Sequence, residues 1–104
     1  MIVINGEKWR VRLVPPSHPS LITDHGTLAI GVCDDITKTI CISNALSLYE
    51  LKKVLLHEIV HAAMYSYNID ISDNIEELLA QIITEYGDEI VYLSNITYDK
   101  MKFI

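Results

Sequence analysis

The segment His57-Glu58-Ile59-Val60-His61 combines the residue types and the spacing that are best suited to chemistry in this chain. Residues four apart lie on one face of a helix, so both imidazoles can bind one metal ion. Glu58 is rotated away from them and is better placed to act as a general base on a metal-bound water. Composition alone would produce this pattern about 0.01 times in a chain of this length. The alternative is a pair of structural histidines on the polar edge of a helix.

A catalytic zinc site needs a third protein ligand and one open position for water. The acidic candidates follow the turn after the second histidine: Asp70, Asp73, Glu76 and Glu77. No histidine follows His61, so any further imidazole would have to come from His18 or His25. Apolar periodicity favours Glu76 as the ligand, whereas a capping interaction between Glu76 and Asp73 would leave Glu77 free for the metal. The residue pattern leaves both glutamates open.

Two helices must position these residues, and we expect them within residues 47–94. Ser47 and Glu50 have the spacing of a capping box, and nothing after them interrupts a helix before about Tyr67. Asp73 is the expected N-cap of the second helix, which carries apolar residues as far as about Ile90.

Residues 1–43 are expected to form β-structure. Alternating apolar and polar residues flank Asn5-Gly6, a pair typical of a tight hairpin turn. A second pair of strands is expected at Leu28–Cys33 and Thr39–Ser43, joined by a turn at Asp34-Asp35. The predicted fold class is α+β: a small antiparallel sheet packed on two helices, in one domain spanning residues 1–104.

The composition narrows the class of protein further. The chain has 104 residues, of which 50% are hydrophobic and 21% charged, which suits one folded domain and excludes a disordered chain. It has no apolar run of about 18 residues, so no membrane span is expected, and no secretory signal is recognisable. The net charge of −6 disfavours a nucleic-acid partner. Two cysteines are too few for a disulfide scaffold and indicate a cytoplasmic location.

The histidine motif, followed by a short turn and Glu77-x-x-Ala80, resembles the gluzincin arrangement of zinc peptidases. Residues 7–93 as a whole resemble small zincin-like proteins of phages and prophages, distant relatives of ImmA/IrrE-type metallopeptidases. The resemblance implies a minimal zincin-like domain, zinc as cofactor, Glu77 as third ligand and the cytoplasm of a bacterial host as location. Gln81 stands where many gluzincins have an acid that orients a ligand histidine, so that role is weaker or moved.

These observations predict a zinc-dependent metallopeptidase with His57, His61 and Glu77 as ligands. A zinc-bound water would hydrolyse the peptide bond, with Glu58 as general base. If the strand Thr39–Ser43 lies at the sheet edge beside the zinc helix, it could pair with an extended substrate. The expected partner is a protein or peptide substrate, such as a regulatory protein.

An alternative function is a non-catalytic zinc-containing module that binds a phage or host protein. A closed shell of four protein ligands, completed for instance by His25, would favour this module, whereas three ligands would favour catalysis. Tyr65, Tyr67 and His25 are candidates to stabilise an oxyanion, although tyrosines more often pack with their hydroxyls at a wet edge. Cys33 and Cys41 are too far apart in sequence for a typical zinc pair.

Overall fold

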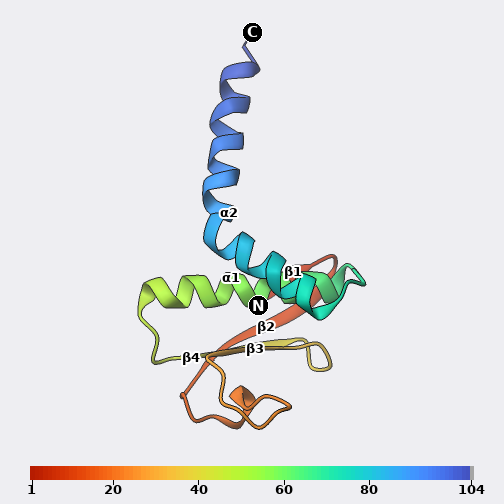
Figure 1. Ribbon diagram of the computed structural model, residues 1–104, viewed down its shortest axis with the longest axis vertical. Coiled ribbons are helices and arrows are strands. Elements are labelled where there is room, and N and C mark those ends of the chain that lie inside the picture. The colour runs from red at the N-terminus through yellow and green to blue at the C-terminus, as the bar shows by residue number, and fades with distance from the viewer. Residues whose placement is uncertain (104) are drawn as a thin grey trace.

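A computed structural model describes residues 1–103 and shows a four-stranded sheet with two helices stacked above it (Figure 1). The strands are β1 (Ile2–Ile4), β2 (Glu7–Val14), β3 (Gly31–Asp34) and β4 (Thr39–Ser43), and the helices are α1 (Leu48–Ser66) and α2 (Asp73–Met101). A 3-10 turn, Pro19–Leu21, lies in the loop between β2 and β3. Helix α1 packs on the sheet and α2 packs on α1. The predicted α+β class is confirmed.

The sheet has the strand order β1-β2-β4-β3 and is mixed, whereas an antiparallel sheet was expected. The two predicted hairpins, β1 with β2 and β3 with β4, are antiparallel. Between them, β2 pairs with β4 in parallel. The chain passes through the long loop and β3 before it enters β4, so β4 can arrive in the same direction as β2.

Thr39–Ser43 does not lie at the sheet edge, so it does not meet the condition for pairing with an extended substrate. This segment is β4, which lies between β2 and β3. Its residues Ile40, Cys41 and Ile42 are all buried, as is typical of an inner strand covered on both faces. The edge strands are β1 and β3; both contact α1, and β3 does so more extensively.

The main core lies between the sheet and α1 and is centred on Trp9, Ile40, Ile42 and Ala62. The Nε1–H of buried Trp9 donates a hydrogen bond to Ser66 Oγ at 2.7 Å. The side-chain amide of Asn5 donates to the carbonyl of Ser66 at 3.0 Å. Because Ser66 is the last residue of α1, these bonds fix the end of that helix against the sheet.

The capping box predicted for the first helix is confirmed. The amide of Glu50 donates to Ser47 Oγ at 3.2 Å, and the amide of Ser47 donates to Glu50 Oε1 at 3.1 Å. These bonds satisfy two amides that a helix start would otherwise leave unpaired. Helix α1 therefore begins at Leu48, and its frame fixes the directions in which His57 and His61 point.

The second helix begins one residue earlier than expected and ends later than expected. Ser72 is its N-cap and accepts a hydrogen bond from the amide of Ile75, so Glu76 is not occupied with capping Asp73. The helix continues past residue 94 to Met101, because no glycine or proline interrupts residues 95–101. Its C-terminal half projects from the body of the molecule (Figure 1). Within residues 1–103, no helix is long and apolar enough to cross a membrane.

Candidate metal centre

His57 and His61 lie one turn apart on α1, and their rings face each other. Their Nε2 atoms are 3.3 Å apart and the ring centroids are 5.0 Å apart. Both side chains are partly buried, with 26% of His57 and 12% of His61 exposed. Two imidazole nitrogens at this separation can bind the same metal ion.

Glu77 of α2 brings a carboxylate to the same place. Its Oε1 lies 2.8 Å from His61 Nε2, and its Oε2 lies 3.3 Å from His57 Nε2. The three donor atoms all lie within 4.8 Å of one another. Tetrahedral zinc with bonds of about 2.0–2.2 Å holds its ligand atoms about 3.3 Å apart, so this donor set fits zinc.

Glu76 lies on the other side of the same histidine. Its Oε2 is 2.5 Å from Nδ1 of His61. A proton on Nδ1 that is donated to Glu76 leaves the Nε2 lone pair available for a metal. The structure thus places the two glutamates differently: Glu77 lies with the donor atoms, and Glu76 orients a ligand ring.

The sequence did not identify Glu76 as the acid that orients a ligand histidine. It showed only that Gln81 stands where many gluzincins have this acid, so that the role was expected to be weaker or moved. The available signal was Ser72, which can cap α2 and release Glu76 from the cap. Adjacent helical residues are rotated by about 100° from each other, so Glu76 and Glu77 can reach two different nitrogens of one ring.

Glu58 is buried next to this group, with 8% of the residue exposed. Burial raises the pKa of its carboxyl to about 7; His61 lowers this pKa and Glu77 raises it. Such a pKa is close to the value that suits a general base at neutral pH.

The backbone of β3 runs against Glu58. A Cβ atom at Gly31 would lie 2.6 Å from Val54 Cγ1 and 3.2 Å from Glu58 Cγ. No side chain larger than hydrogen fits there unless the Val54 side chain shifts or β3 and α1 move apart. The glycine therefore lets the edge strand lie directly beside the candidate base.

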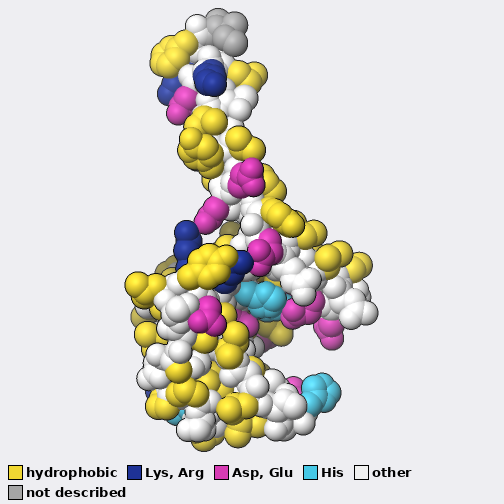
Figure 2. Space-filling view, turned by 60° about the vertical axis from the view of Figure 1, so that its left-hand side comes forward, with side chains coloured by type: hydrophobic (Ala, Val, Ile, Leu, Met, Phe, Trp, Pro, Cys, Tyr) yellow, Lys and Arg dark blue, Asp and Glu magenta, His cyan; other side chains and the backbone are white. Residues whose placement is uncertain are grey.

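Two hollows flank the group. The first has a volume of about 560 Å³ and is lined by Gly31, Val54, His57 and Glu58, among others. The second has a volume of about 390 Å³ and is lined by His61, Tyr65 and acidic residues of α2. Figure 2 shows histidine and acidic side chains together near the hollow between the helices and the sheet.

The other sequence candidates lie apart from the donor atoms. His18 Nδ1 accepts a hydrogen bond from the amide of Ser20 at 3.0 Å, and His25 is exposed in the loop. In the part of the chain that the structure describes, neither histidine joins the group, which has three members. Tyr65 lines the hollow beside His61, whereas Tyr67 follows the end of α1.

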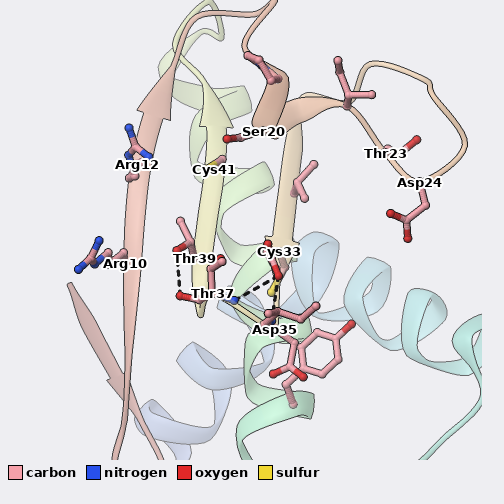
Figure 3. A pocket seen from close by; sticks show the side chains of 16 residues that line it. Arg10, Arg12, Ser20, Thr23, Asp24, Cys33, Asp35, Thr37, Thr39 and Cys41 are labelled. Carbon is pink, nitrogen blue, oxygen red and sulfur yellow. Dashed lines mark hydrogen bonds between the residues drawn. The ribbon is translucent and has the colours of Figure 1, made fainter.

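A larger pocket of about 890 Å³ lies on the face of the sheet that points away from α1 (Figure 3). Arg10, Arg12, Thr39 and Cys41 contribute to this face. Cys33 and Cys41 both line the pocket as free thiols. Burial, and then the nearby Glu58, raise the pKa of the Cys33 thiol to about 12. A thiol with this pKa is neither a ready nucleophile nor a ready metal ligand.

No family model, no curated protein and no solved structure matches this chain. The resemblance to small phage zincin-like proteins therefore stays a prediction. The chemistry of the site follows from its own residues and their geometry.

Proposed function

We propose that this chain is a zinc-dependent peptidase, with His57, His61 and Glu77 as zinc ligands and Glu58 as general base. The observation that carries the proposal is the convergence of two Nε2 atoms and one carboxylate, all within 4.8 Å, beside the buried Glu58. Zinc bound there would lower the pKa of water to about 7 and would stabilise negative charge on a carbonyl oxygen.

Glu58 moves the proton in this reaction. Its carboxylate accepts a proton from the water that attacks the peptide carbonyl, and it later delivers this proton to the leaving amine nitrogen. Burial raises the pKa of this carboxyl, which favours uptake of the proton that it later delivers. Glu76 acts as a positioning residue because its contact with Nδ1 holds the ring of His61 in one orientation.

The substrate in this proposal is an extended peptide that pairs with β3. As an edge strand, β3 has backbone N–H and C=O groups free on one side for pairing. Gly31 brings this edge next to Glu58. Leu28, Ile30 and Val54 line the hollow at that end, which would receive an apolar substrate side chain.

The number of ligands supports hydrolysis over the alternative of a non-catalytic binding module. Among residues 1–103 the group has three members, so one tetrahedral position stays open to water. The net charge of −6 favours a protein or peptide over a nucleic acid as partner. Cys33 and Cys41 are free thiols, which is consistent with the cytoplasm of a bacterial host as location.

The test is to compare the zinc-loaded wild type with Glu58→Gln on a mixture of unfolded peptides, with cleavage products read by mass spectrometry. We expect Glu58→Gln to keep its zinc and to lose cleavage by about 10²–10⁴-fold. Glu50→Gln is the matched control, because the capping box at the start of the same helix accepts glutamine. Cleavage by Glu58→Gln at the wild-type rate would contradict the assignment of the base. Zinc binding with no cleavage by the wild type would favour the binding module.

A further inference from the structure

The projecting half of α2 carries an apolar face that no other part of the described chain covers. Every three or four residues an apolar or small side chain recurs on this face: Tyr86, Ile90, Leu93, Thr97 and Met101. The four large ones are between 49% and 61% exposed. This spacing places all five on one side of the helix. Nearer the start of α2, the side that packs on α1 carries Ala80, which is fully buried, and Ile83 and Gly87, which are half-buried. Ile83 lies seven residues before Ile90 and on the same side, so the exposed face in part continues the packed one.

The accessible surface and the radius of gyration of the chain are both larger than those of a compact chain of the same length. Its accessible surface is 7535 Å², about 1,600 Å² more than a globular chain of this length is expected to have. Its radius of gyration is 15.7 Å, against about 13 Å for a compact chain of this length. A standard interface buries about 800 Å² on each partner. The excess surface of the whole chain is larger than this area, which leaves room for an interface.

Two charged residues indicate how a second copy would lie on this face. Glu89 and Lys100 are eleven residues apart, about three helical turns, so both flank the apolar face on the same side. Within residues 1–103 neither of them forms an ion pair. In a parallel pair of helices the two-fold axis runs along the pair and puts the two copies of each charge on opposite flanks, so Glu89 and Lys100 would not meet. In an antiparallel pair, Glu89 of each copy comes within reach of Lys100 of the other.

We propose that the projecting half of α2, residues 86–101, pairs antiparallel with the same segment of a second copy of this chain. A two-fold axis near Leu93 places Tyr86 opposite Met101, and Ile90 opposite Thr97. Glu89 and Lys100 then form two equivalent ion pairs, because a two-fold axis repeats every contact. An isolated helical segment of this length is marginal in water, and pairing covers its apolar face. The proposal does not depend on the metal centre, which lies near the start of α2.

The first test is the mass of the whole chain in solution, measured by sedimentation over a concentration series. We expect a dimer for the wild type and a monomer for Leu93→Glu. The metal content of this variant, and the stability of its sheet and α1 against unfolding, should equal those of the wild type. Asn95→Glu is the matched control, because it adds the same charge on the opposite side of the helix and should stay dimeric. A monomeric wild type, or a Leu93→Glu variant that stays dimeric, would overturn the proposal.

Charge reversal tests the antiparallel arrangement itself. Glu89→Lys and Lys100→Glu should each raise the dimer dissociation constant by about tenfold, because each puts like charges together at both ends. The double variant E89K/K100E recreates both pairs with the signs exchanged and should restore the wild-type constant. If the single variants weaken the dimer and the double variant weakens it further, the two charges do not meet and the antiparallel arrangement is wrong.

Discussion

Glu76 Oε2 lies 2.5 Å from Nδ1 of His61, so a carboxylate of α2 fixes a ring of α1 through the nitrogen that points away from the candidate metal position. On the opposite nitrogen of the same ring, Glu77 Oε1 lies 2.8 Å away. Two neighbouring residues of one helix thus contact both nitrogens of one histidine. This arrangement fixes the direction of the His61 ring before any metal is bound.

Removal of the charge of Glu76 should weaken zinc binding without abolishing it. We expect Glu76→Gln to lower zinc affinity by about 10–100-fold, because His61 loses the partner that orients it. Competition with a coloured chelator measures this change. Asp73→Asn is the control, since Asp73 lines the same hollow but lies outside the metal-binding group. An unchanged affinity in Glu76→Gln would show that the contact does not position the ring.

A methyl group at Gly31 should push β3 away from α1. Gly31→Ala places a Cβ 2.6 Å from Val54 Cγ1, and we expect this overlap to cost about 1–3 kcal/mol of unfolding free energy. Urea unfolding measures the loss, and peptide cleavage should fall as well because the edge strand moves away from Glu58. The double variant Gly31→Ala/Val54→Ala should recover part of the lost stability and part of the lost cleavage, because it removes the methyl group that the new Cβ overlaps. If Gly31→Ala unfolds like the wild type, β3 and α1 are not in this close contact.

Cys33 should react slowly with alkylating reagents in the folded chain. Its thiol pKa is raised from 9.0 to about 12, mainly by burial, so at pH 9 it keeps a proton that about half of the unfolded molecules have lost. We expect alkylation at this pH to be at least about a hundredfold slower than in urea, measured for the Cys33 peptide by mass spectrometry. Because the thiol pKa is higher in the folded chain than in the unfolded chain, the free energy of unfolding should fall as pH rises above about 9. In Cys33→Ala, which lacks the thiol, this fall should be smaller. Equal alkylation rates in buffer and in urea would contradict the raised pKa.

Loss of the Ser66 hydroxyl should destabilise the fold although it lies outside the metal centre. Ser66→Ala leaves the buried Nε1–H of Trp9 without its acceptor, and we expect a cost of about 1–3 kcal/mol. Urea unfolding checks this value, with the exposed Ser94→Ala as control. Equal stability of Ser66→Ala and Ser94→Ala would show that the indole does not depend on this bond.

Local signals predicted most of the secondary structure. Asn5-Gly6 with its positive φ angles and the Ser47–Glu50 capping box lie where the sequence placed them. The turn expected at Asp34-Asp35 follows Asp34, and the strand before it begins at Gly31 instead of Leu28. The parallel pairing of β2 with β4 was missed because it depends on how two distant hairpins dock, which no local pattern encodes. The order of strands also decides which one is the edge, so the role given to Thr39–Ser43 failed for the same reason.

The site was predictable where one helix determines it. The four-residue spacing of His57 and His61 was enough to put their rings together. The roles of Glu76 and Glu77 depend on where α2 begins and how it is rotated against α1. The cap at Ser72 instead of Asp73 shifts that start by one residue. A change this small lies below what sequence periodicity resolves.

The zinc content of the purified chain tests the central claim most directly, measured after zinc loading and dialysis in the wild type, His57→Ala and Glu77→Ala. We predict about one zinc per chain in the wild type and a loss of zinc in both variants, since each variant removes one of three ligands. A wild type that retains no zinc, or a His57→Ala variant that retains as much as the wild type, would contradict the metal centre.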